Sequence, residues 1–182
     1  SEITPVLNQT NDLFARELNQ KICKRAPKLS DTITHANSAI AADAASFVVL
    51  VSELFLKNKM CKGVEVLGSG TSGVIPEEAP LAPVGAIKAL LDQTKISLSN
   101  VAFIELMEAY AAQAIICTRL CDLDLDKVNI RGGALSRGHP IGASGAILVV
   151  RLFNELINTP GASGMAAIAA AGGIGSAMML KS

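Results

Sequence analysis

Apolar runs of strand length alternate along the chain with longer segments in which apolar residues recur every three or four positions. This alternation is typical of a layered α/β fold, in which helices cover the faces of a sheet. The pattern is most regular after residue 100 and continues to the last residues. There we expect strands at 101–106, 127–130, 165–170 and 176–181 and helices at 108–121 and 142–158.

The part of the chain before residue 63 is less regular. Residues 2–6 indicate extended chain, the apolar run 46–51 favours a buried strand, and a short helix at 53–59 runs out into lysines. One further helix, capped by Thr10 or Asn11 and ended by Pro27, is indicated by four apolar residues on one face: Leu13, Phe14, Leu18 and Ile22.

Residues 63–95 predict a strand, a loop and a helix in that order. The strand covers 63–68, and the loop 69–81 holds most of a GSGTSG run and two prolines. Pro83 then begins a helix over 84–95. The GSG glycines are a weak phosphate-loop pattern because the lysine of such a loop is missing, so a plain surface loop is the favoured interpretation.

Composition adds limits on the class of protein. Half of the 182 residues are hydrophobic, and 16 Lys and Arg balance 16 Asp and Glu. A chain of this length can bury enough surface to fold without staples, and its balanced charge attracts neither nucleic acid nor an anionic membrane. No signal peptide is recognisable, and the apolar stretches 44–56 and 164–180 are too short or too glycine-rich to span a membrane. We therefore expect a soluble, cytoplasmic protein.

The four cysteines show no spacing typical of a metal site, and reduced thiols are the simplest interpretation. They are Cys23, Cys61, Cys117 and Cys121. Cys117 and Cys121 stand four residues apart on one predicted helix, where packing as small apolar side chains is favoured over a thiol pair or half a metal site. We expect no metal and no covalently bound cofactor.

The stretch GGALSRGHPIGASG at 132–145 is the strongest candidate for chemistry. It holds His139, one of only two histidines, in a glycine-rich turn that opens a long apolar helix. Gly138 and Pro140 restrict the backbone on either side of this imidazole. The free N–H groups at the start of the following helix can stabilise negative charge.

The GHPIGASG turn resembles a signature of the thiolase superfamily, and three more segments resemble motifs of that family. They are TITHANSAIAADAAS at 32–46, IELMEAYAAQ at 104–113 and GMAAIAAAGGIG at 164–175. The last is closest in style to thiolases of fatty-acid β-oxidation. The resemblance covers nearly the whole chain but only the later half of a thiolase. It implies a thiolase-like C-terminal half-domain, layered α/β/α, at 63–182, preceded by a partial N-terminal half-domain at 1–62.

Carried over residue by residue, the resemblance implies a partly altered acyl-CoA site. His139 matches the histidine that activates the nucleophilic cysteine and donates to the thioester oxygen. Glu108 is retained as a positioning residue, whereas Met107 stands where the family has an Asn or His of an oxyanion hole, and a thioether cannot donate that hydrogen bond. Ala169 replaces the cysteine that moves a proton to and from the substrate α-carbon. The backbone N–H of Ala171 matches a donor of the second oxyanion hole.

For the coenzyme, the resemblance implies contacts near Asn37, which is retained, and Ala39, which replaces a serine that helps hold coenzyme A. Coenzyme A or acyl-CoA is then a substrate. His35 falls where the family has a small residue, and we expect a hydrogen-bonded histidine without catalytic duty.

The nucleophilic cysteine of the family lies in the first half of a thiolase, and none of the four cysteines here corresponds to it. We therefore expect the C-terminal part of an acetyl-CoA acetyltransferase type of enzyme, inactive alone. Its nucleophile would come from an N-terminal thiolase-like subunit or from a missing N-terminal segment. An unpaired apolar strand at 46–51 predicts association with such a subunit or with a second copy of the chain.

Two alternatives stay open. The chain can be a degenerate, non-catalytic protein that binds CoA, an acyl chain or a subunit, in which His139 only holds its own turn by hydrogen bonds. It can also be a fragment of a longer thiolase.

Overall fold

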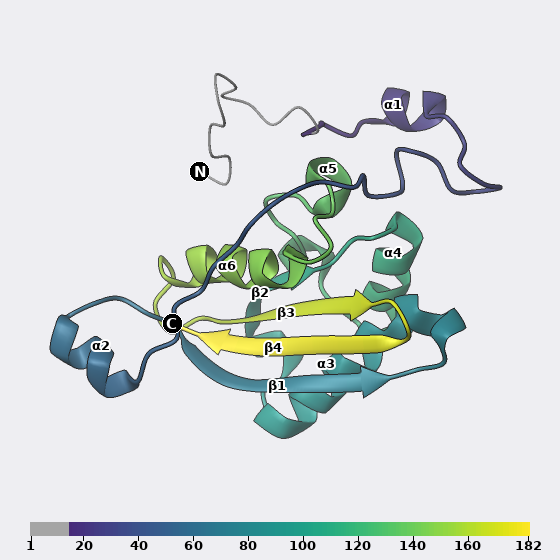
Figure 1. Ribbon diagram of the computed structural model, residues 1–182. Coiled ribbons are helices and arrows are strands. Elements are labelled where there is room, and N and C mark those ends of the chain that lie inside the picture. The colour runs from purple at the N-terminus through teal and green to yellow at the C-terminus, as the bar shows by residue number, and fades with distance from the viewer. Residues whose placement is uncertain (1–14) are drawn as a thin grey trace, which may run out of the picture.

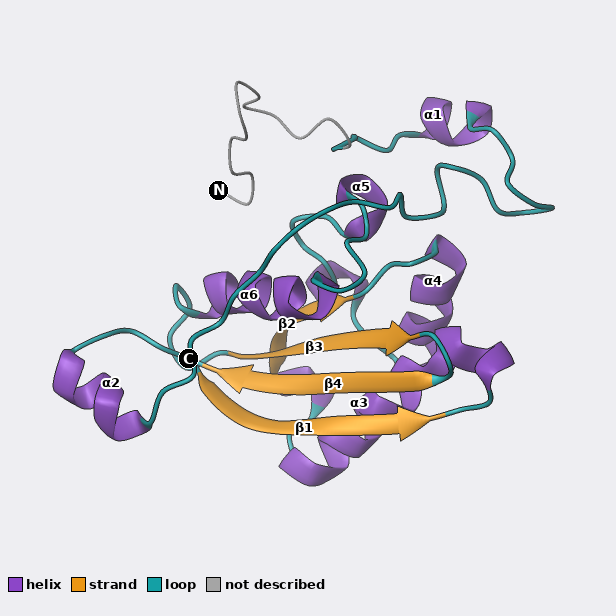
Figure 2. Ribbon diagram, viewed as in Figure 1, coloured by secondary structure: helices purple, strands orange, loops and turns teal. Residues whose placement is uncertain are grey.

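The computed structural model describes residues 15–182, and a four-stranded mixed sheet lies at its centre (Figures 1 and 2). The order of the strands across the sheet is β1-β4-β3-β2. β2 and β3 are parallel, while β4 is antiparallel to both of its neighbours. The strands are β1 (Glu65–Gly73), β2 (Val101–Leu106), β3 (Ser163–Ala170) and β4 (Ile174–Lys181).

Successive residues of β3 and β4 enter two different cores, as the period of two in a strand requires. Met165 and Met179 face α3 (Ala82–Thr94) and α4 (Ala111–Leu120). Ala166 and Leu180 face the other way, into a cluster with Leu148, Leu152 and Leu156 of α6 (Ser144–Leu156). Helices thus cover both faces of the sheet (Figure 2), and the predicted α/β/α layering is confirmed.

The glycine run at 68–73 has a different role from the predicted one. Residues 69–73 belong to β1 and pair with β4, so the interpretation as a surface loop is wrong there. The reason is tertiary: a Cβ at Gly70 would overlap the Ala86 carbonyl, so the missing side chain lets α3 lie directly against the strand. The chain then turns through η1 (Pro76–Leu81) into α3.

Two short helices lie in the part before the sheet, α1 (Gln20–Arg25) and α2 (Glu53–Lys59). The predicted helix at 53–59 is confirmed. The predicted cap residues Thr10 and Asn11, the extended stretch 2–6, and Leu13 and Phe14 lie outside the described residues. The described helix begins only at Gln20, because the Asn19 side chain accepts the Ile22 N–H at 3.0 Å, so Leu18 lies before it.

The strand predicted at 46–51 is wrong for the described chain. These residues are extended but pair with no strand of the described sheet, and Phe47, Val49 and Leu50 are more than three quarters exposed. A β-branched, apolar pattern favours extended backbone, but only a neighbouring strand can complete its hydrogen bonds.

In the second half, two predicted elements differ from the structure. The segment 127–130 forms no strand: it follows a 3₁₀ turn, η3 (Leu125–Lys127), and makes one isolated bridge, from Val128 to Ile104. The pairing stops there because Asn129, at a φ of 48°, turns the chain away from β2. The helix expected from residue 108 begins at Ala111, since the preceding residues are extended and contact another segment. The remaining short elements are η2 (Leu98–Asn100) and α5 (Ala134–Arg137). Within residues 15–182, no helix has the length and apolar character needed to cross a membrane.

Candidate active site

The candidate site lies at the carboxyl edge of the parallel strands. Glu108 follows the end of β2, and His139 lies in the turn before α6, whose first residues reach the same edge (Figure 1). A third segment, residues 37–41, joins the two: the Ala39 N–H donates to Ala109 O at 2.9 Å, and the His139 N–H donates to Ile40 O at 2.7 Å. Three stretches far apart in sequence therefore meet here.

The Glu108 carboxylate is held from two sides. Asn129 Nδ2 donates to its Oε1 at 2.6 Å, and the Leu135 N–H donates to its Oε2 at 3.2 Å. The Asn129 amide also accepts the Leu106 N–H and donates to Leu106 O, both at 2.8 Å. Asn129 thus pairs with the end of β2 as a neighbouring strand would and fixes Glu108 just beyond it. Sequence analysis missed this residue, since the sequence shows only an asparagine, a residue type that tolerates positive φ.

The turn before α5 is shaped to leave room for this carboxylate. A Cβ at Gly133 would overlap the carboxyl group of Glu108, so any larger residue would have to displace that carboxyl group from its hydrogen bonds. The preceding carbonyl, Gly132 O, accepts from Arg151 Nη2 at 2.9 Å, and Arg151 forms a buried ion pair with Glu105 of β2. The glycine pair is therefore anchored to both α6 and β2.

His139 is half-buried and has one side-chain partner at its Nδ1. Ser144 Oγ lies 2.8 Å from Nδ1 and donates to Pro140 O at 3.0 Å. A hydroxyl that gives its hydrogen to a carbonyl accepts from Nδ1–H, which leaves Nε2 with a lone pair. Burial lowers the pKa of His139 below 6.5, so the imidazole is neutral at pH 7. A neutral ring can take a proton, as a general base must.

The other candidate site residues lie in different environments. Met107 is 3% exposed and packs in the α6-side core, so its thioether fills space between sheet and helix. Ala169 lies in β3 opposite Gly175, and Ala171 lies in the exposed turn between β3 and β4. Ala39 also packs against the α6-side core.

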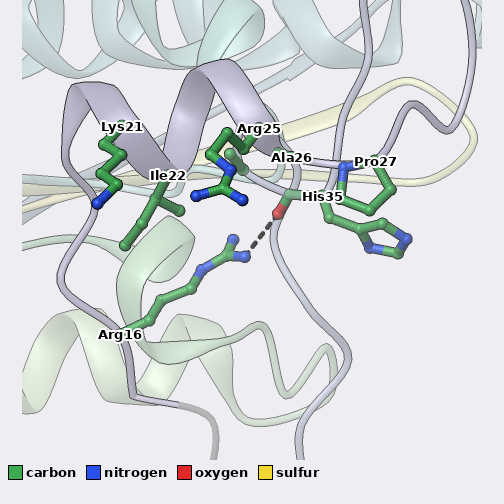
Figure 3. Close-up of a pocket in the computed structure, with 8 residues that line it drawn as sticks. Arg16, Lys21, Ile22, Arg25, Ala26, Pro27 and His35 are labelled. Atoms are coloured by element: carbon green, nitrogen blue, oxygen red, sulfur yellow. Dashed lines mark hydrogen bonds between the residues drawn. The ribbon is translucent and has the colours of Figure 1, made fainter.

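The segment that contains His35 and Ala36 borders a hollow of about 540 Å³ (Figure 3). Arg16, Lys21 and Arg25 line it together with His35, whose backbone oxygen accepts from Arg16. The Asn37 side chain is engaged within its own turn, where Oδ1 accepts the Thr34 N–H at 2.7 Å. Its backbone oxygen accepts the Ala111 N–H at 2.9 Å. The hollow is thus lined by both cationic and apolar side chains, and Asn37 shapes the adjoining turn.

The cysteines lie in two kinds of environment. Cys23 and Cys61 are exposed, whereas Cys117 and Cys121 are buried in the core beneath α3. Burial raises the pKa of both buried thiols, that of Cys121 to about 11. Among residues 15–182 no group of three or more His, Cys, Asp or Glu is placed to hold a metal ion.

Comparisons with known proteins agree with this geometry. Residues 61–182 match the family described as thiolase, C-terminal domain. YhfS of Bacillus subtilis, named as an acetyl-CoA C-acetyltransferase, is 39% identical over 154 residues, which are 84% of this chain and 42% of that protein.

Two solved structures have the same fold. The crystal structure of the Bacillus anthracis acetyl-CoA acetyltransferase superposes with a TM-score of 0.83 at 31% identity, over 88% of this chain and 42% of that one. Human mitochondrial 3-ketoacyl-CoA thiolase in complex with CoA also gives a TM-score of 0.83, at 29% identity, over 94% and 45%. The chain spans less than half the length of each of these relatives. The family match and the shared fold show that this chain belongs to the thiolase family, whose C-terminal domain it carries.

Proposed function

We propose that the chain is the C-terminal part of an acyl-CoA acyltransferase of the acetyl-CoA acetyltransferase type, in which His139 is the general base. The observation that carries the proposal is the meeting of His139 and Glu108 at one sheet edge, joined by residues 37–41. In this role His139 Nε2 takes the proton from a cysteine thiol as the sulfur attacks the acyl carbonyl. Glu108 holds the 133–135 turn in place, and the Ala171 N–H is a candidate donor to the developing oxyanion.

The nucleophile is the part that these residues do not supply. Cys117 and Cys121 are buried with raised pKa values, which disfavours the thiolate. Cys23 in α1 and Cys61 just after α2 are exposed. We therefore propose that the cysteine comes from a thiolase N-terminal half, either in the same polypeptide or in a partner, and that residues 1–182 alone are inactive.

The proposed ligand is coenzyme A or its acyl thioester, with no covalently bound cofactor. The basic hollow lined by Arg16, Lys21 and Arg25 suits the phosphates of such a ligand. A related thiolase crystallised with CoA supports this choice. Asn37 and Ala39 lie on the segment that borders the hollow. We further propose that residues 1–62 belong to a thiolase N-terminal domain and that residues 63–182 form the C-terminal domain. We also propose that the protein acts in fatty acid metabolism in the cytoplasm.

The exposed apolar run is the proposed contact for a thiolase N-terminal half. Phe47, Val49 and Leu50 are each at least 80% exposed, more apolar surface than an isolated soluble chain ordinarily leaves in one stretch. An extended segment with open N–H and C=O groups can pair with a strand of an N-terminal thiolase-like subunit or with a second copy.

A non-catalytic binding protein is the second candidate. Met107 occupies a core position, and Ala169 has no proton to transfer. Such a chain would still bind CoA and a subunit but perform no acyl transfer.

Light scattering of the chain, alone and co-expressed with a thiolase N-terminal half, tests the assembly. We expect association in at least one case, and replacing Val49 and Leu50 by serine should reduce it. A monodisperse 18.8 kDa monomer that retains no partner would overturn the proposed association through this run. Titration calorimetry with CoA tests the ligand.

A further inference from the structure

Arg16 connects two parts of the site that are far apart in sequence. Its guanidinium donates to three backbone carbonyls: Nε to Leu135 O at 2.9 Å, Nη1 to His35 O at 2.6 Å and Nη2 to Ser38 O at 3.1 Å. The Arg16 backbone N–H adds a fourth bond, to Ser136 O at 2.8 Å. One side chain therefore ties α5 to the segment at 35–38, as Figure 3 shows for His35.

Each segment that Arg16 contacts is hydrogen-bonded in turn to Glu108 or to Ala109 and Ala111, which follow it in the chain. The same Leu135 whose carbonyl accepts from Arg16 donates its N–H to Glu108. The 35–38 segment includes Asn37, whose backbone oxygen accepts the Ala111 N–H, and is followed by Ala39, whose N–H donates to Ala109 O. The hydrogen bonds thus form a closed circuit around the sheet edge, and the Arg16 guanidinium closes it between α5 and residues 35–38 with three donors.

Arg16 also lines the basic hollow, so it faces the proposed ligand and the Glu108 network at once. We propose that Arg16 is a positioning residue that couples occupation of the hollow to the placement of Glu108. We call the three hydrogen bonds from the Arg16 guanidinium the clamp. The coupling rests on the proposed function, because that function identifies the ligand, whereas the clamp is independent of it. A lysine keeps the charge but cannot reach three carbonyls in a planar fork, so Arg16→Lys separates geometry from charge.

Amide hydrogen exchange of the full chain, followed by NMR, tests the clamp. In Arg16→Lys we expect the amides of Leu135, Ala39 and Ala111 to exchange about tenfold faster or more, because charge-assisted hydrogen bonds that hold their segments are lost. The ¹³C shift of the Glu108 carboxyl should move as well. The Met165 amide in the middle of the sheet reports on global stability and should exchange at the parent rate. Unchanged exchange at Leu135, Ala39 and Ala111 would overturn the clamp.

Calorimetric titration with CoA tests the coupling, with Arg119→Lys as the matched control because Arg119 is an exposed arginine of α4 that does not line the hollow. We expect Arg16→Lys to weaken CoA binding about fivefold or more and Arg119→Lys to leave it at the parent value. Faster exchange combined with parent-like CoA affinity would overturn the coupling. Absence of CoA binding to the parent chain would overturn the proposed ligand and with it the coupling, while the exchange rates still decide the clamp.

Discussion

Replacing Asn129 by aspartate tests how the Glu108 carboxylate is held. Asn129 is 8% exposed and its Nδ2 donates to both Glu108 Oε1 and Leu106 O. Aspartate has nearly the same shape and tolerates the positive φ of 48° at this position. The change therefore replaces a donor by a carboxylate oxygen next to Glu108 without altering the packing.

The loss in stability has two sources. A neutral hydrogen bond to Leu106 O contributes about 1 kcal/mol and the bond to the Glu108 carboxylate about 1.5–3 kcal/mol. Two carboxylates about 4 Å apart repel by about 4 kcal/mol at an effective dielectric constant of about 20. We expect Asn129→Asp to lower the free energy of unfolding by about 6–8 kcal/mol at pH 8. At lower pH the folded variant binds a proton that the unfolded chain still releases, so its stability rises as pH falls from 8 to 5.

Urea unfolding followed by circular dichroism at pH 8 and pH 5 measures this. The deficit of Asn129→Asp relative to the parent should shrink by at least about 1.4 kcal/mol at pH 5, the equivalent of one pH unit. Asn129→Ala removes the same hydrogen bonds without adding charge, so its deficit should be nearly independent of pH. An aspartate variant with the same deficit at both pH values would refute the reasoning.

Three further changes probe other parts of the site. Gly133→Ala places a Cβ on the Glu108 carboxylate and should destabilise the chain by about 1–3 kcal/mol in urea unfolding, whereas a parent-like midpoint would contradict the fit. Burial lowers the pKa of His139, so the unfolded chain binds its proton first and stability should fall as pH drops below 6.5; His139→Gln should lose this part of the pH dependence. Under native conditions a thiol reagent should label the two exposed cysteines at least about tenfold faster than Cys117 and Cys121, and equal rates would contradict the packing of α4.

Much of the layering could be predicted because it depends on local pattern. The alternation in β3 and β4 gives the two faces of the sheet, and the helix after His139 follows from its apolar period and the glycine-rich turn. The positions of Glu108 and His139 at one edge follow from strand and helix order once the sheet is parallel there.

The failures share a tertiary cause. Residues 46–51 have the pattern of a strand, but no pattern within a segment tells whether a partner strand is present. Gly70 suggested a loop, although its role is to let α3 approach β1. Asn129 and Arg16 act on backbone groups that are distant in sequence, 23 residues away for Asn129 with Leu106 and 119 for Arg16 with Leu135, and no local pattern of residue types marks such contacts.

We propose above all that this chain supplies the histidine side of a thiolase site and that the nucleophilic cysteine comes from a thiolase N-terminal half. A thiolysis assay with an acyl-CoA thioester and free CoA tests it most directly, on the chain alone and after co-expression with the N-terminal half of a thiolase. We predict no turnover above background for the chain alone, and turnover with the N-terminal half that disappears in His139→Ala. Turnover by the chain alone that His139→Ala abolishes would contradict the claim.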